Sequence, residues 1–143
     1  MITGLPKYSG KVLRHRASSP KLLVQNTALM SVYSGLSFSQ AKQNLQFWGR
    51  LVESAVGAYL FNASQDKNIE IFYWLERNRE VDFVLSRGND LVAIEVKSTR
   101  RRDYLPGISL FSSRFPVKKK LLVGADGIPL SEFLTTDPKV WFD

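Results

Sequence analysis

The chain has 143 residues, 44% of them hydrophobic, and a formal net charge of +7, which indicates one globular domain with a core of its own. The absence of cysteine excludes disulfides and thiolate metal sites and fits a reducing compartment. No apolar run reaches the roughly 18 residues of a membrane helix, and the N-terminus lacks the apolar core of a signal peptide. We therefore expect a cytoplasmic protein with no membrane partner.

The positive charge is concentrated at the start of the chain. Residues 1–50 contain seven Lys or Arg and no Asp or Glu, whereas residues 51–143 contain 13 basic and 13 acidic residues. Such an excess is typical of proteins with an acidic partner, and nucleic acid is the commonest one. We expect DNA as the partner. A solvated basic surface is the alternative, and a homodimer is left open.

Residues 1–44 are predicted to form a basic N-terminal arm and short helices that pack on the core. Ser37 and Gln40 have the spacing of a capping box. Gly35 is placed to end the helix before them. The expected elements are an arm or loop over residues 1–20, a strand over 21–25, a helix from Asn26 or Thr27 to Tyr33, and a helical turn opened by Ser37.

Residues 45–143 are predicted to form the core of this single domain, and its clearest element is a helix over Leu45–Asn62. Apolar side chains recur there at helical spacing and form one broad face. Gly49, Glu53 and Gly57 lie in one i, i+4 row at the edge of this face. Because a glycine in a helix costs about 1 kcal/mol against alanine, the two glycines indicate a close approach of the backbone to a packed neighbour.

The remaining elements predict a sheet. Short, turn-like segments separate three apolar stretches, which favours an antiparallel meander. The resulting order is αβββαβ, an α/β domain with a mixed central sheet. The expected elements are strands over residues 69–75, 80–86 and 91–98, a helix over 106–114, a strand over 120–123, a helical turn over 129–134, and a polar tail.

The segment LVAIEVK places an acid and a base in an otherwise apolar strand. Glu95 and Lys97 share one face of it because side chains alternate along a strand. In a tight meander the end of this strand lies near the beginning of the preceding one, which carries Asp82. We therefore expect Asp82 and Glu95 within reach of one cation, with Glu53 as a third carboxylate from the packed helix. A partly buried ion-pair cluster is the alternative.

Carboxylates of this kind suit hard divalent ions such as Mg²⁺. A lysine beside them can orient and help deprotonate a water for attack on phosphorus, while the metal polarises the phosphate. The only histidine, His15, lies in a basic loop, so chemistry that needs a pair of histidines is excluded. Catalysis by carboxylates and a bound metal ion is the mechanism that the remaining residues favour. Glu80 is expected to be a solvent-facing or ion-pair residue.

These residues resemble the signature of the PD-(D/E)XK nucleases, with Glu53 on a helix and Asp82 and Glu95-x-Lys97 on successive strands. The αβββαβ order is that of their restriction-endonuclease-like core. More closely, five segments in order resemble the uncharacterised domain found C-terminal to AAA-type ATPase modules in bacterial and archaeal proteins. The resemblance extends from about residue 9 to the end, and its segments are SSPKLLVQNTALM, FWGRLVESAVGAYL, REVDFVL, AIEVKS and KKKLLVG.

The resemblance implies Mg²⁺ or Mn²⁺ bound by Asp82 and Glu95 with support from Glu53, and a water-activating or phosphate-orienting role for Lys97. Val81 replaces the proline of the signature name. The ATPase module is absent from this sequence. Its nearest approach to a phosphate loop, GLPKYSGKV, has one residue too many between its glycines and ends in valine instead of Ser or Thr. We therefore expect a C-terminal fragment of a longer ATPase or the product of a decayed gene.

Two functions from different classes follow. The first is a Mg²⁺-dependent deoxyribonuclease, and the second is a catalytically silent nuclease-fold module that binds DNA or a partner for an AAA-type ATPase. A pure protein-interaction domain is disfavoured by the basic arm. Glu53 could instead be a rim residue paired with Arg50 or another base. The candidate nucleic-acid contacts, with a solvated charge run as the alternative, are Arg14, Arg16, Arg100, Arg101 and Arg102.

Overall fold

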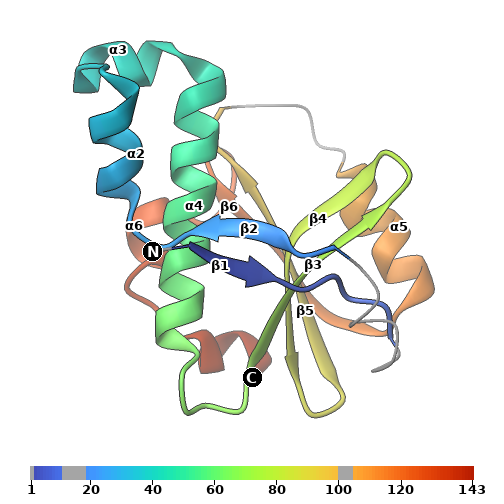
Figure 1. Ribbon diagram of the computed structural model, residues 1–143. Helices are drawn as coiled ribbons and strands as arrows, with labels where there is room; N and C mark the ends of the chain where they lie inside the picture. Colours follow the sequence, from blue (N-terminus) through green and yellow to red (C-terminus); the bar gives the residue numbers. More distant parts are fainter. Residues whose placement is uncertain (1, 11–18, 100–104) are drawn as a thin grey trace.

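The computed structural model describes residues 2–10, 19–99 and 105–143, and its helices and strands are drawn in Figure 1. In chain order they are β1 (Ile2–Leu5), β2 (Lys21–Val24), α2 (Thr27–Ser34), α3 (Phe38–Gln43), α4 (Leu45–Ala63), β3 (Glu70–Glu76), β4 (Arg79–Arg87), β5 (Asp90–Lys97), α5 (Pro106–Arg114), β6 (Val117–Gly124), α6 (Leu130–Phe133) and the 3₁₀ helix η1 (Pro138–Phe142).

The central sheet has the strand order β3-β4-β5-β6. β3, β4 and β5 form the expected antiparallel meander, and β6 adds in parallel beside β5 after the α5 crossover. The sequence α4-β3-β4-β5-α5-β6 confirms the predicted αβββαβ order and the mixed α/β fold. β5 lies between β4 and β6 and is therefore a central strand, and its consecutive buried residues show that both of its faces are covered.

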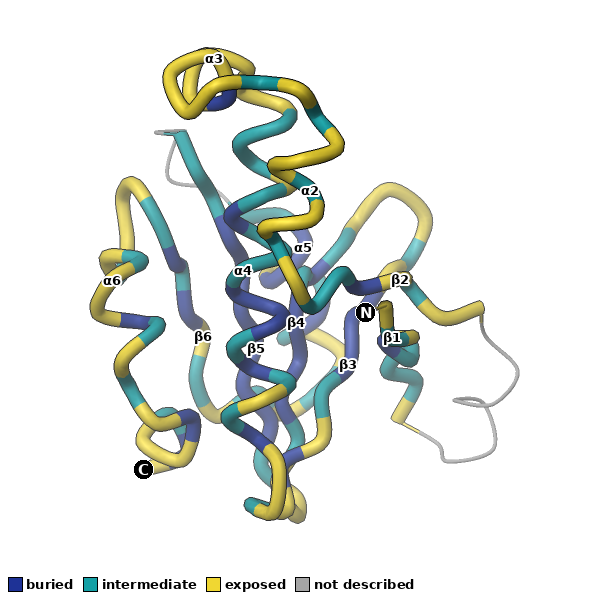
Figure 2. Tube along the Cα trace, turned by 60° about the vertical axis from the view of Figure 1, so that its left-hand side comes forward, coloured by how far each residue is buried: buried dark blue, intermediate teal, exposed yellow. Residues whose placement is uncertain are grey.

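The two faces of the sheet bury two separate hydrophobic clusters. On one face Val52 and Val56 of α4 pack with Ile94 and Val96 of β5. On the other face Phe111 of α5 packs with strand residues that alternate with these. In Figure 2 the inner turns of α4 and the middle of the meander are buried, whereas α2 and α3 stand largely outside this core. The sheet is therefore held between α4 and α5.

The caps of the N-terminal helices form as their sequence predicts. Asn26 caps α2, and Gly35 ends it with a φ of 66°. Ser37 and Gln40 form a reciprocal capping box at the start of α3. These short-range signals decide the helix boundaries because each side chain bonds to a backbone group three residues away or less.

Close packing accounts for only one of the two glycines in α4. A Cβ at Gly57 would lie 2.5 Å from Leu23 Cδ1 and 2.9 Å from Phe83 Cζ, so β2 and β4 approach the helix backbone there. A Cβ at Gly49 would meet only the Ser98 hydroxyl, at 3.4 Å. The predicted close approach is therefore confirmed at Gly57 and wrong at Gly49.

The two ends of the chain correct the sequence-based prediction. Within the expected arm, β1 pairs antiparallel with β2, and Leu5 enters the core. The expected polar tail contains η1, which buries Phe142 and is capped by the Asp137 side chain. Both elements are too short to show hydrophobic periodicity, and tertiary packing rather than local propensity stabilises them. No helix in the described part of the chain is long and apolar enough to cross a bilayer.

Candidate active site

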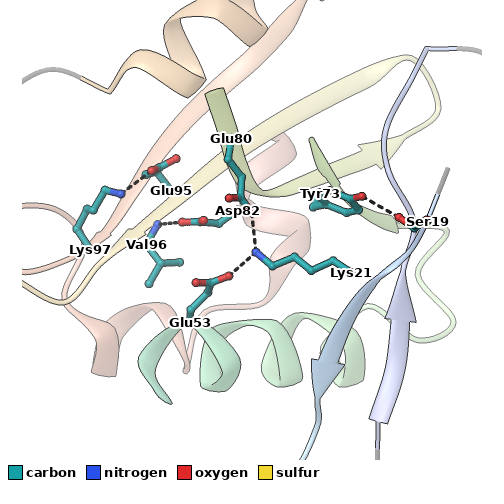
Figure 3. Close-up of polar contacts among 9 residues, drawn as sticks. All are labelled: Ser19, Lys21, Glu53, Tyr73, Glu80, Asp82, Glu95, Val96 and Lys97. Atoms are coloured by element: carbon teal, nitrogen blue, oxygen red, sulfur yellow. Dashed lines mark hydrogen bonds and ion pairs between the residues drawn. The ribbon is translucent and has the colours of Figure 1, made fainter. Parts of the chain in front are cut away.

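Strand pairing brings Asp82 and Glu95 to neighbouring positions. The β4–β5 ladder ends at the pair Phe83 and Ile94, and Asp82 and Glu95 are the next residues of their strands. On the other side of β4, the register shifts between Phe72 and Trp74 of β3, so that an extra β4 residue is accommodated at Asp82. β-Bulges of this kind redirect side chains beside active sites. Figure 3 shows the Asp82 carboxylate reaching across to β5.

Asp82 is partly buried and fixed by the backbone. The Val96 N–H donates a hydrogen bond to Asp82 Oδ2 at 2.8 Å, in place of a ladder bond that β4 no longer makes. Burial raises the pKa of Asp82, and the negative charges of Glu95 and Glu53 raise it further. The Val96 hydrogen bond opposes this rise without cancelling it. The carboxyl is therefore held firmly where its negative charge is disfavoured unless a cation joins it.

Glu95 is more buried than Asp82, with 8% of its surface exposed. The ammonium of Lys97 contacts Glu95 Oε1 at 2.7 Å, while Oε2 is buried and has no hydrogen-bond partner within the described residues. Burial raises the pKa of Glu95; Lys97 acts against this, and the charges of Glu80 and Glu53 add to it. A buried carboxylate oxygen without a hydrogen-bond donor lowers the stability of the fold by about 1–3 kcal/mol. A bound cation would offset this cost.

A second ion-pair group lies on the other side of Asp82, and the sequence analysis did not predict it. Lys21 Nζ lies 2.7 Å from Glu53 Oε1 and 2.7 Å from Glu80 Oε1, so that one ammonium joins β2, α4 and β4 (Figure 3). Burial disfavours the charge of Lys21, but its bonds to both carboxylates outweigh this and raise its pKa. Glu80 is thus an ion-pair residue as expected, and Glu53 pairs with a base other than Arg50.

One sequence signal could have identified Lys21. In the segment KLLV, Lys21 and Leu23 share a face because side chains alternate along a strand, and Leu23 is buried. A lysine on the inward face of a strand needs an acidic partner. Its two partners lie 32 and 59 residues away, so only the folded chain identifies them.

The two ion-pair groups lie on opposite sides of the sheet. Val96 packs in the α4 cluster, so Glu95 and Lys97, which alternate with it, face the α5 side, whereas Glu53 projects from α4. Among the described residues no three His, Cys, Asp or Glu side chains are arranged to hold one metal ion. Glu53 and Glu95 are each held by a lysine instead, and Asp82 lies between them (Figure 3).

The cluster nevertheless has the donor chemistry of a divalent-cation site. It contains two ammonium groups and four carboxyl groups, which leaves two formal negative charges when all are ionised. The ammonium groups belong to Lys21 and Lys97, and the carboxyl groups to Glu53, Glu80, Asp82 and Glu95. All donors are oxygens, which Mg²⁺ and Mn²⁺ prefer. The unpartnered Glu95 oxygen and the raised pKa of Asp82 are both relieved by a bound cation.

A cavity of about 310 Å³ opens on the α4 side of this cluster. Its polar lining includes Lys21, Arg50 and Glu53, and apolar side chains of β1, β2, α2 and β4 line the rest. Small ions can therefore reach the Lys21–Glu53 pair. The proposed phosphate contacts Arg14, Arg16 and Arg100 to Arg102 lie outside the described residues, and their position relative to the cluster stays a prediction.

The comparisons with known proteins agree with part of the sequence analysis. A family model described as a domain of unknown function, DUF4143, matches residues 48–131, from the first turn of α4 to the start of α6. No curated protein and no solved structure matches the chain. The matched region contains Glu53, Asp82, Glu95 and Lys97 and covers more than half of the sequence. The chain therefore belongs to the DUF4143 family of domains of unknown function.

Proposed function

We propose that this protein is a nuclease-fold domain of the PD-(D/E)XK type that hydrolyses DNA phosphodiesters with a divalent metal ion. One observation carries the proposal: Asp82 and Glu95 meet where β4 and β5 separate, with a buried, unpartnered Glu95 oxygen and Lys97 beside it. A protein that needed only a stable core gains little from a central strand carrying this acid and this base, because breaking such a pair is costly and an apolar pair packs as well.

In this proposal each residue has a role that its position supports. Asp82 and Glu95 would hold Mg²⁺ or Mn²⁺ through oxygens on adjacent strands, with Glu53, whose charge acts on Asp82 from the α4 side, as a supporting ligand. The Val96 N–H keeps Asp82 Oδ2 in place, which restricts how the carboxylate can turn. When bound, the ion would polarise the phosphate and stabilise the leaving oxygen.

Lys97 is the residue that acts on the water or the phosphate in this proposal. Its ammonium lies on Glu95 and is only partly exposed, so it can hold a phosphate oxygen or assist removal of a water proton next to the ligand carboxylates. Hydrolysis adds the hydroxyl of water to phosphorus, and its proton goes to the sugar oxygen that leaves. The positive charge of Lys97 offsets part of the charge that this step builds up.

A second function is favoured by a different observation. Because no three carboxylates among the described residues are arranged around one point, and Lys21 and Lys97 already occupy Glu53 and Glu95, the domain could bind DNA or a protein without cutting. In this alternative it is a silent nuclease-fold module that serves as the C-terminal domain of an AAA-type ATPase, and the ion pairs stabilise the fold only.

Cleavage of DNA distinguishes the two functions. The purified protein is incubated with plasmid and single-stranded DNA, with and without Mg²⁺ or Mn²⁺, beside Asp82→Asn and Lys97→Met. Asp90→Asn is the matched control because Asp90 lies at the other end of β5, paired with Lys118. Metal-dependent cleavage that both site variants lose and Asp90→Asn retains supports the nuclease. Salt-sensitive DNA binding without cleavage, equal in all variants, supports the silent module and contradicts the nuclease.

A further inference from the structure

Lys21 joins the N-terminal strands to the carboxylate cluster. It belongs to β2, whereas the DUF4143 match begins at residue 48, within α4. Its ammonium makes two ion pairs of equal length, with Glu53 and Glu80, and its side chain is 34% exposed. The N-terminal strands thus place a fixed positive charge at the edge of the candidate metal site.

The position of Lys21 is set by packing on both sides of it. Leu23 lies so close to α4 that a Cβ at Gly57 would clash with it, and Leu5 of β1 is buried in the same core. Before β2, the Tyr73 hydroxyl donates a hydrogen bond to the Ser19 carbonyl at 2.8 Å (Figure 3). β2 is therefore anchored to α4 and to β3, and the Lys21 ammonium cannot leave its carboxylates by a small local movement of the backbone.

A fixed ammonium at this point competes with a second cation. It bonds to one oxygen of Glu53, a proposed metal ligand, and links that carboxylate to Glu80. Two like charges a few ångströms apart repel by about 4 kcal/mol at the effective dielectric constant of a protein surface, and this repulsion weakens the binding of a cation nearby. The cavity beside Lys21 lets solvent ions reach the same oxygens.

We propose that Lys21 is an internal counter-ion that competes with the divalent metal for Glu53 and so sets the metal affinity of the site. This inference rests on the proposed function, because it requires a metal site at Asp82 and Glu95. Without metal, Lys21 bonds to both Glu53 and Glu80 and offsets one of their two negative charges. When metal binds, Glu53 is shared or released by Lys21. Any contact that lifts β2 away from α4 then favours the metal-bound site.

The test measures the binding of Mn²⁺ alone, by calorimetry and by the loss of the free-ion electron paramagnetic resonance signal. It compares the wild type with Lys21→Met and with Lys21→Gln, which removes the charge but keeps an amide donor and so protects the fold. Lys21→Arg keeps the charge. Lys67→Met removes a lysine of an exposed ion pair with Asp137 and is the matched control. Asp82→Asn reports whether any bound Mn²⁺ occupies the proposed site.

We expect Lys21→Met and Lys21→Gln to bind Mn²⁺ at least about tenfold more tightly than the wild type, because a like charge has been removed from beside the ion. Mn²⁺ should also raise their melting temperature more than that of the wild type, while Lys21→Arg and Lys67→Met stay at wild-type affinity. Unchanged or weaker binding in both Lys21 variants, with Mn²⁺ binding still abolished by Asp82→Asn, overturns the competition and leaves the metal site standing. If neither the wild type nor the Lys21 variants bind Mn²⁺, the proposed metal site fails and the inference fails with it.

Discussion

Two ion-pair groups flank Asp82, and they are built in different ways. Glu95 and Lys97 are two residues apart on one strand, so the backbone of β5 fixes them together. Lys21, Glu53 and Glu80 come from three elements and meet only when β2, α4 and β4 have packed. The first group depends on strand geometry alone and is expected to perform the chemistry. The second depends on the tertiary fold and is expected to control access of the metal.

The largest difference between the two groups should appear in activity. Glu95→Gln is expected to reduce metal-dependent DNA cleavage at least about 100-fold, or about 2.7 kcal/mol of transition-state stabilisation, because the proposed direct ligand of the metal loses its charge. Glu53→Gln should reduce cleavage less, since Glu53 is proposed only as a supporting ligand. Initial rates at saturating Mg²⁺ give the comparison. Equal losses in the two variants would contradict the division of roles.

Packing beneath the site should give an effect of similar size, on stability. A Cβ at Gly107 of α5 would lie 1.8 Å from the Glu80 carbonyl oxygen, and this backbone atom cannot turn aside. Gly107→Ala is therefore expected to lower the free energy of unfolding by about 3 kcal/mol, at the upper end of the usual cost of overpacking. Chemical denaturation measures it. Gly49→Ala is the matched control, because only the Ser98 hydroxyl is near, and it should be neutral or stabilise by up to about 1 kcal/mol.

How far the sequence predicts the molecule depends on the distance over which each feature is determined. The caps at Asn26 and Ser37, the meander and the Glu95–Lys97 pair were predictable because their partners lie a few residues away or on a strand joined by a short turn. β1, η1 and the Lys21 ion pairs were not, since long-range packing selects them. Asp82 was placed beside Glu95 by the hairpin register, but the bulge that turns it was not foreseeable from the pattern of apolar residues.

Stability should separate Lys21 from an ordinary surface lysine. In the absence of metal, Lys21→Met is expected to destabilise the fold by about 1–2 kcal/mol, because Glu53 and Glu80 are left facing each other without a counter-ion. Lys67→Met should change the unfolding free energy by less than about 0.5 kcal/mol, as is usual for an exposed pair. Urea denaturation in a metal-free buffer tests the contrast. If Lys21→Met is as stable as Lys67→Met, the second group contributes nothing to the fold.

A further contrast is a pH dependence of stability centred on Asp82. The pKa of Asp82 is raised in the fold, so its contribution is present below the ordinary aspartate pKa of about 4 and is lost as pH rises through the raised pKa. Asp82→Asn should remove this loss, so its stability relative to the wild type should increase with pH by about 1.4 kcal/mol for each unit of pKa shift. Denaturation between pH 4 and pH 9 measures the difference. A difference independent of pH would show that Asp82 is not held in a charge-disfavouring position.

The position of a bound metal ion tests the central claim most directly. Crystals grown with Mn²⁺ can be measured at an X-ray wavelength where manganese scatters anomalously. The account predicts an anomalous peak within about 2.5 Å of oxygens of both Asp82 and Glu95, with the Lys97 ammonium close by. Well-ordered Asp82 and Glu95 side chains with no peak between them at saturating Mn²⁺, or a peak only at other residues, would contradict it.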